Sequence, residues 1–347
     1  MRQKNKSILV TGGLGYVGSH TTVSLLNAGY DVVIVDNCSN SFLEVIERIR
    51  KISHGNVTWV DADVSSMADM ELVFARHQFV GIIHFAAYVS VPESVTSPYK
   101  YYTNNINTLA TILHFAMQDE KNIPLVFSSS AAVYGDASTA PLREDEPFAP
   151  HASPYAITKQ VGEMMIRNFV SAYGGKAIAL RYFNPVGGHS SGLLGEHYRM
   201  PVFHLVPALC EVAAGLREKI VVFGDDYPTP DGTCIRDYIH VMDVAEAHIA
   251  ALTHLYSDPE SDFEAFNIGS GSGYSVKTMI EEFQKVNSVI VPCTYSDRRA
   301  GDPACLVADT EKAQNILKWK PRYTLADMHR TAWQWQKYGL DALSDTQ

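Results

Sequence analysis

Short apolar runs alternate with longer stretches of helical spacing through the first half of the chain. Strands are predicted over the apolar runs at residues 7–13, 31–36, 56–64, 80–87, 123–130 and 177–184. Residues 16–29 and 42–52 are typical of the amphipathic helices expected between them. The runs are apolar throughout, as in strands that are covered on both faces. This pattern predicts an α/β fold with a doubly wound parallel sheet, Rossmann-like in its organisation.

The proline content and the spacing of apolar runs change after Asn184. Nine of the 16 prolines lie beyond this residue, and apolar runs such as residues 219–224 and 264–269 are scattered among helices and long loops. We expect two domains, with the parallel sheet in residues 1–184 and a smaller C-terminal α/β lobe in residues 185–347. Some strands and helices of the second half are allowed to return to the first domain.

Composition and charge narrow the class of protein. Apolar residues make up 46% of the chain and charged residues 19%, which favours a compact fold. The formal charge of -10 is spread along the chain without a basic run, so no nucleic-acid partner is expected. The five cysteines are odd in number, widely spaced and without metal-ligand spacing, which favours a reducing cytoplasm and no metal site. No apolar run reaches the roughly 20 residues of a membrane span, and the first strand begins too early for a signal peptide.

A glycine-rich loop joins the first predicted strand to the first helix. Gly12, Gly15 and Gly18 allow a tight turn, which lets a pyrophosphate approach backbone N–H groups at the start of the helix. A glycine-rich turn without a ligand is the alternative. Asp36 ends the second strand, eighteen residues after Gly18, where a carboxylate binds the ribose of NAD and repels the 2′-phosphate of NADP, although it could also be only a cap. Asp63, after the third strand, could reach the adenine.

Tyr155 and Lys159 stand four residues apart in a predicted helix and therefore share one face of it. A free phenol has a pKa near 10, so a tyrosine base at neutral pH must have its pKa lowered by roughly three, equivalent to about 4 kcal/mol. A lysine ammonium one turn away and a cationic nicotinamide together could supply that. The pair follows a strand that ends in serines, behind the dinucleotide loop, and this context makes a catalytic role the favoured interpretation.

The glycine loop, the strand-end serine at Ser130 and the Tyr-x-x-x-Lys pattern together resemble the extended short-chain dehydrogenases/reductases. Residues 181–196, 223–248 and 298–303 closely resemble the UDP-glucose 4-epimerases within that family, and the resemblance runs from Ser7 to Trp335. It implies reversible C4 epimerisation of UDP-glucose and UDP-galactose with tightly bound NAD. It also implies a homodimer built on a helix bundle, plausibly including residues 103–118 and 157–173.

The resemblance also implies which residues form the site. Ser130 and Tyr155 would be the catalytic pair, with Lys159 behind them. NAD would be held by Gly12, Gly15, Tyr16, Val17, Gly18, Asp36, Asn37, Asp63, Val64, Phe85, Ala86, Ala87, Asn104, Ser128, Tyr155, Lys159 and Phe183. The UDP-sugar would be held by Ser130, Tyr155, Tyr182, Asn184, His204, Leu205, Val222, Phe223, Arg236, Tyr238, Arg299, Asp302 and Leu306. Planar arginine cations suit a pyrophosphate, whereas a surface salt bridge is the alternative for Arg236 and Arg299.

The loop after the catalytic serine limits the chemistry. Relatives that dehydrate a nucleotide sugar have Asp-Glu in the two positions where this chain has Ala131 and Ala132. Elimination of water needs a base and an acid beyond the tyrosine, so the reaction should stop at reversible hydride transfer. The alternatives are another NAD-dependent nucleotide-sugar dehydrogenase or dehydratase, and a catalytically silent NAD-binding regulatory protein.

This chain departs from many relatives at two positions. Val89 stands where they have a lysine, and His204 stands where they have an asparagine.

His240 is expected to be a packed structural histidine. Leu306, seven positions after Arg299, would lie beside the C2 substituent of the sugar. Its intermediate volume implies a preference for UDP-glucose and UDP-galactose, with weaker turnover of the N-acetylated pair. The alternative for Leu306 is a purely packing role.

Overall fold

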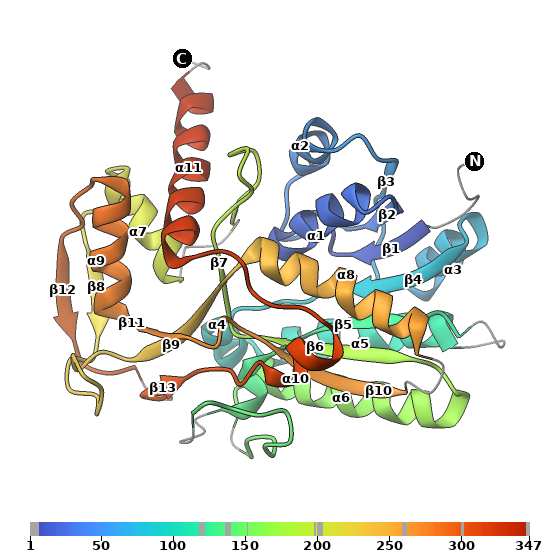
Figure 1. Ribbon diagram of the computed structural model, residues 1–347. Helices are drawn as coiled ribbons and strands as arrows, with labels where there is room; N and C mark the ends of the chain where they lie inside the picture. Colours follow the sequence, from blue (N-terminus) through green and yellow to red (C-terminus); the bar gives the residue numbers. More distant parts are fainter. Residues whose placement is uncertain are drawn as a thin grey trace.

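The computed structural model describes residues 7–117, 122–135, 140–150, 152–197, 199, 204–258, 262–299 and 302–344. A seven-stranded sheet forms its centre, with the strand order β10-β6-β5-β4-β1-β2-β3 and every pair parallel (Figure 1). The strands are β1 (Ser7–Thr11), β2 (Asp31–Val35), β3 (Val57–Val60), β4 (Phe79–His84), β5 (Leu125–Ser130), β6 (Ala177–Tyr182) and β10 (Phe263–Ile268). The predicted doubly wound parallel sheet is therefore confirmed.

Helices cover both faces of this sheet (Figure 1). One face carries α1 (Tyr16–Asn27), α2 (Glu44–Ile52) and α8 (Val241–Ser257), and the other carries α3 (Met67–Arg76), α5 (Pro98–Met117) and α6 (Pro154–Tyr173). Within β1, Ile8 and Val10 belong to the first core whereas Leu9 belongs to the second, and all three are fully buried. Successive side chains of a strand point to opposite faces. Two buried faces therefore explain why the runs show no polar alternation.

A smaller lobe stands beside the carboxyl ends of the central strands (Figure 1). It contains a four-stranded sheet of β7 (Asn184–Val186), β9 (Ile235–His240), β11 (Gly273–Ser275) and β13 (Cys305–Leu306), and a separate pair of β8 (Ile220–Phe223) and β12 (Cys293–Ser296). Its helices α7 (Leu205–Ala213), α9 (Val276–Asn287) and α11 (Leu325–Ser344) pack around a third apolar core. The remaining short helices are α4 (Val91–Thr96), the 3₁₀ turn η1 (Ala131–Tyr134) and α10 (Glu311–Ile316).

The chain does not divide cleanly after Asn184. Strand β10 pairs with β6 at the edge of the central sheet, and α8 packs on α1 over that sheet. Phe266 and Ile268 of β10 are fully buried in the first core. The run at residues 264–269 therefore completes the large sheet instead of the small lobe, which is the return of later elements that the domain prediction allowed.

Candidate active site

A cavity of about 1260 Å³ lies between the carboxyl ends of the central strands and the smaller lobe. Residues that follow β1, β2, β3, β4, β5 and β6 line one side, and residues of β8, β9 and β13 line the other. Carboxyl ends of parallel strands form the usual ligand crevice of doubly wound folds. Every site residue predicted above lines this cavity except Lys159, which lies directly behind it. The structure thus brings together both predicted ligand-binding sets.

The glycine loop forms a cradle at the start of α1. Gly12 has a φ of +67°, and a Cβ there would lie 2.8 Å from the backbone nitrogen of Ala86. A Cβ on Gly18 would collide with the carbonyl oxygen of Gly12. Helix α1 begins after Gly15 with no side-chain cap and no acidic residue in its first turn. The backbone N–H groups at this helix start are therefore available to an anion, and the cradle fits the pyrophosphate of a dinucleotide.

Asp36 connects the glycine loop to the end of β2. One carboxylate oxygen accepts hydrogen bonds from the backbone N–H of Cys38 at 2.9 Å and from the Ser41 hydroxyl at 2.7 Å. The other oxygen accepts from the backbone N–H of Leu14 at 3.0 Å. Asp36 therefore acts as a cap and also lines the cavity, so the two interpretations of this residue are compatible. Binding of the adenosine ribose at Asp36 stays a prediction, as does the adenine contact of Asp63.

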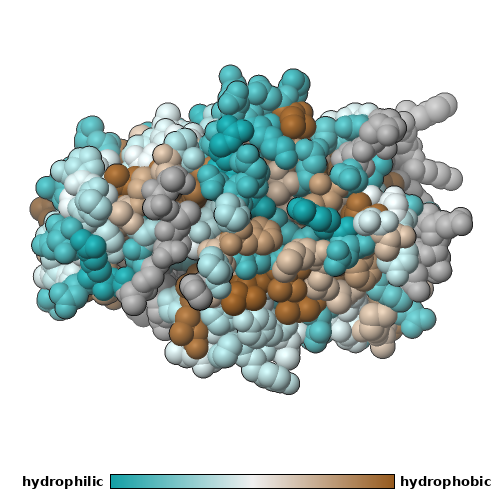
Figure 2. Space-filling view, turned by 90° about the horizontal axis from the view of Figure 1, so that it is seen from below, coloured by the Kyte–Doolittle hydropathy of each residue, from teal (hydrophilic) through white to brown (hydrophobic). Residues whose placement is uncertain are grey.

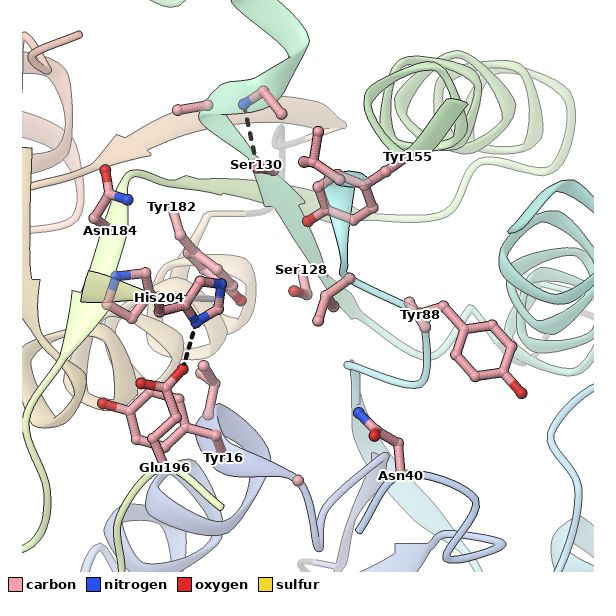
Figure 3. A pocket seen from close by; sticks show the side chains of 18 of the residues that line it. Tyr16, Asn40, Tyr88, Ser128, Ser130, Tyr155, Tyr182, Asn184, Glu196 and His204 are labelled. Atoms are coloured by element: carbon pink, nitrogen blue, oxygen red, sulfur yellow. Dashed lines mark hydrogen bonds and ion pairs between the residues drawn. The ribbon is translucent and has the colours of Figure 1, made fainter. Parts of the chain in front are cut away.

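Tyr155 and Lys159 project from the first turns of α6 toward β5. The helix begins at Pro154, where the Ser153 hydroxyl accepts a hydrogen bond from the backbone N–H of Ala156 at 3.3 Å. Figure 3 shows the Tyr155 ring beside Ser130, with its hydroxyl turned into the cavity. The Lys159 ammonium donates to the backbone carbonyl of Ser128 at 2.6 Å and lies 5.7 Å from the centre of the Tyr155 ring. The tyrosine, the lysine and the serine thus form one cluster.

Burial controls the protonation of this cluster. It raises the pKa of Tyr155, and the neighbouring Ser130 hydroxyl acts in the opposite direction. Burial also lowers the pKa of Lys159 to about 7, against the influence of the Glu163 carboxylate. Desolvation disfavours the charged form of each group. A phenolate at position 155 therefore depends on positive charge beside it, from the Lys159 ammonium and from whatever cation binds in the cavity.

Ser130 is positioned as a donor to a ligand. Its side-chain oxygen accepts a hydrogen bond from the backbone N–H of Ala132 at 3.1 Å and so caps η1. Because that contact uses a lone pair, the hydroxyl proton stays available to a group in the cavity. Ala131 and Ala132 also line the cavity, and neither carries an acid or a base.

Tyr182 has a partner that the sequence did not reveal. Its hydroxyl lies 2.5 Å from Nε2 of the buried His248, whose Nδ1 lies 2.8 Å from the carbonyl oxygen of Val244. A carbonyl only accepts, so Nδ1 carries the proton and Nε2 accepts from the tyrosine. Burial lowers the pKa of His248 to about 4, which keeps this histidine neutral. His248 was missed because nothing in the apolar spacing of α8 distinguishes it from a packing residue.

Glu196 is a second residue that the sequence analysis did not assign. Its carboxylate lines the cavity and lies 2.8 Å from Nδ1 of His204 (Figure 3). Desolvation acts to lower the pKa of His204, but Glu196 outweighs it and raises the pKa overall. The departure from asparagine at position 204 therefore places a titratable group inside the cavity. Val89, the other departure, also lines the cavity and leaves 46% of its surface exposed.

The smaller lobe contributes the predicted arginines. Arg236 lies 3.4 Å from Asp302 and donates to the carbonyl of Pro303 at 2.8 Å, whereas the Arg299 guanidinium lies 4.0 Å from the centre of the Phe223 ring. Leu306 pairs with Arg236 across β13 and β9, lines the cavity and also packs on a small apolar cluster. Residues 300 and 301, within the string that resembles the epimerases, lie outside the described residues. The binding roles of these side chains stay predictions.

His240 does not line the cavity. His240 is fully buried, accepts from the backbone N–H of Met242 at 3.1 Å and lies 3.0 Å from the Thr331 hydroxyl, so its structural role is confirmed. All five cysteines are free. Among the described residues there is no cluster of metal-ligating side chains, and no helix is long and apolar enough to cross a membrane.

A family model and curated relatives each match nearly the whole chain. Residues 9–332 match the family model described as GDP-mannose 4,6 dehydratase. The UDP-glucose 4-epimerase of Bacillus subtilis (strain 168) is 44% identical over 336 residues, which cover 96% of this chain and 98% of the relative.

Two solved structures superimpose over nearly the whole chain. UDP-glucose-4-epimerase from Stenotrophomonas maltophila, with bound NAD and formylated UDP-arabinopyranose, gives a TM-score of 0.93 at 41% identity and covers 97% of this chain and 100% of that one. UDP-glucose 4-epimerase from Bifidobacterium longum, in complex with NAD+ and UDP, gives 0.91 at 39% identity with coverage of 97% and 99%. The chain therefore belongs to the UDP-glucose 4-epimerases of the extended short-chain dehydrogenase/reductase family.

Proposed function

We propose that this protein interconverts UDP-glucose and UDP-galactose by reversible inversion at C4 of the sugar, through a 4-keto intermediate and with a tightly held NAD. The observation that carries the proposal is that Tyr155 and Ser130 share one cavity with the glycine cradle, with Lys159 directly behind them. NAD, when bound, takes a hydride from C4 and returns it to the other face of the keto sugar. Asp36 makes NAD the expected cofactor instead of NADP.

The chain's own groups account for the proton movements. Tyr155, as phenolate, removes the proton from the sugar O4 while the Ser130 hydroxyl donates a hydrogen bond to the same oxygen. The Lys159 ammonium stabilises the phenolate that burial would otherwise disfavour. Arg236 and Arg299 hold the UDP end, so that the keto sugar turns over within the cavity without leaving. The same tyrosine then returns the proton to O4.

The alternatives are weaker on the same geometry. A dehydratase needs an acid and a base beside the catalytic serine, and that loop presents Ala131 and Ala132 to the cavity. A dehydrogenase would release reduced cofactor, and a silent NAD-binding protein would not need Tyr155 and Lys159 in contact distance of β5. Epimerisation uses every group that is present and needs none that is missing from the described loop.

A direct assay tests the proposal. Purified protein is incubated with UDP-galactose without added cofactor, UDP-glucose is measured, and the supernatant of denatured protein is analysed for NAD and NADP. We expect UDP-glucose to form and NAD to be released. Release of NADH or of a stable keto sugar would favour the dehydrogenase or dehydratase. Finding mainly NADP in the supernatant would show that Asp36 does not bind the ribose.

Tyr155→Phe is the matched variant for this assay. It deletes the phenolic base and little packing, so we expect activity to fall at least about a thousandfold while NAD stays bound. More than about a tenth of the wild-type rate would overturn the assignment of Tyr155.

We further propose that two copies pair through α5 and α6, the two helices on the lower side of the central sheet in Figure 1. Met164 and Tyr173 of α6 leave 48% and 55% of their surfaces exposed. Figure 2 looks at this side of the molecule and shows apolar residues gathered near its middle. Sedimentation should report a dimer in the wild type and a shift toward monomer in Met164→Glu.

The five free cysteines support a reducing compartment, and we place the protein in the cytoplasm.

A further inference from the structure

A buried ion pair lies behind the catalytic strand, on the side away from the cavity. Glu163 of α6 and Arg181 of β6 expose only 1% and 4% of their side chains, and two contacts of 2.8 and 3.0 Å join them. The Ser129 hydroxyl of β5 donates to the same carboxylate at 2.5 Å. Arg181 also donates to the Tyr134 hydroxyl at 2.8 Å. One carboxylate thus connects one helix to two neighbouring strands.

These three elements carry the groups proposed for catalysis. Glu163 follows Lys159 by one helical turn and Tyr155 by two. In β5, Ser129 bonds Glu163 between Ser128 and Ser130, whose side chains point to the other face of the strand. In β6, Arg181 directly precedes Tyr182, which lines the cavity. The Glu163 carboxylate therefore fixes the position of α6 relative to β5 and β6, the two strands that face the substrate.

Glu163 is also the anion that faces Lys159. From the other packed elements, β4 contributes His84, which burial and the Lys159 charge keep neutral by lowering its pKa to about 3. Helix α5 contributes the uncharged Asn105, which donates to Thr158 at 3.1 Å. Beyond these lie Tyr155 on the same helix and Arg181 behind Glu163. The carboxylate acts against the burial that lowers the pKa of Lys159.

We propose that Glu163 is a positioning residue for the epimerase reaction, which aligns Tyr155 and Lys159 with Ser130 and keeps Lys159 in its ammonium form. This inference rests on the proposed function. Without the Glu163 charge the pKa of Lys159 falls further, because burial is then less opposed. A smaller fraction of the enzyme carries the ammonium at neutral pH, and the Tyr155 phenolate loses its partner. The alkaline limb of kcat therefore moves to lower pH, whereas the UDP-binding residues in the other lobe are untouched.

Glu163→Gln tests this with a side chain of nearly the same shape. We expect kcat for UDP-galactose to fall at least about tenfold with KM changed less than about twofold, and the alkaline limb of the kcat profile to move down by about one pH unit. Because the single variant leaves a buried guanidinium without its anion, Glu163→Gln combined with Arg181→Gln is made in parallel. Besides burial, Glu163 is the group whose charge acts on the pKa of Lys159, so the double variant should show the same shift.

Tyr134→Phe is the matched control. It removes a hydroxyl from the same network, between Arg181 and Asn267, without changing any charge. We expect it to lower thermal stability and to leave the pH profile and kcat unchanged. If the folded Glu163 variants have wild-type kcat and a superimposable pH profile, the network is merely structural and the proposal is wrong. An inactive wild type would instead refute the proposed function, so the two failures are distinguishable.

Discussion

At the scale of single residues, His204 and Leu306 are two side chains that line the cavity and differ in chemistry. His204 brings a titratable imidazole whose pKa Glu196 raises. Leu306 brings an apolar surface that cannot donate a hydrogen bond. Each gives a substitution whose effect on substrate binding has a definite direction.

Leu306→Tyr should change which sugars are accepted. Leucine leaves an intermediate space beside the C2 position, so we expect the wild type to prefer UDP-glucose and UDP-galactose over the N-acetylated pair by roughly 10- to 200-fold in kcat/KM. A tyrosine fills that space and should increase the ratio further. An unchanged ratio in the variant, or a wild type that favours the N-acetylated sugars, would show that Leu306 only packs against its apolar cluster.

His204 should make substrate affinity depend on pH. Below the raised pKa the protonated imidazole neutralises Glu196, and above it the pair carries a net negative charge toward a ligand that bears two phosphates. The KM for UDP-galactose should therefore rise about threefold as the pH increases through the pKa of His204. His204→Asn removes the proton and should make KM independent of pH over the same interval. A wild-type KM that stays flat would contradict the assigned role.

At the scale of elements, the two ends of α1 separate a binding role from a structural one. A Cβ on Gly18 would meet the Gly12 carbonyl in the cradle, whereas Gly29, with a φ of +87°, has open space around it. Gly18 lies in the first turn of α1, and Gly29 lies in the turn that follows the helix. Their substitution by alanine therefore compares a blocked loop with a strained but empty turn.

Gly18→Ala should displace the glycine loop and abolish retention of NAD through purification. Gly29→Ala should cost about 1 kcal/mol of folding stability, because alanine resists a positive φ, and should leave NAD bound. The measurement is cofactor content per chain, together with urea unfolding of both variants. If Gly18→Ala retains a full complement of NAD, the loop is not the pyrophosphate cradle.

At the scale of the whole molecule, buried histidines make stability depend on pH. Burial lowers the pKa of His20, His248 and His329 to about 4, and that of His84 and His240 to about 3. In the unfolded chain these imidazoles titrate near 6.5. Between those values the unfolded state binds protons that the folded state does not, so the free energy of unfolding falls as the pH falls.

Urea unfolding at pH 7.5, 6 and 5 checks this expectation. The midpoint should drop with each step, most steeply below pH 6.5. His329 offers a variant, because neither ring nitrogen has a hydrogen-bond partner among the described residues and its ring packs edge-on against Phe283. His329→Phe should reduce by about one the number of protons taken up on unfolding, and so weaken the pH dependence of the unfolding free energy. A midpoint that does not change between pH 7.5 and 5 would refute it.

The sequence alone was sufficient for features that depend on short-range chemistry. Unbroken apolar runs required a sheet buried on both faces, and the spacing of Gly12, Gly15 and Gly18 required a tight turn before a helix. The four-residue spacing of Tyr155 and Lys159 placed both on one helical face. Resemblance to a known family then extended these local features to a larger set of cavity residues.

Only the tertiary structure decided what lies across from what. The return of β10 and α8 to the central sheet, the Glu196–His204 pair and the Glu163–Arg181 pair all join positions that the chain separates by loops or whole elements. His248 reaches Tyr182 from a helix 66 residues further along. Such contacts depend on how packed elements are rotated and offset, which hydrophobic spacing does not encode, and burial then sets the protonation of each pair. The sequence thus determined the elements and the chemistry they carry, whereas packing determined which of these groups act on one another.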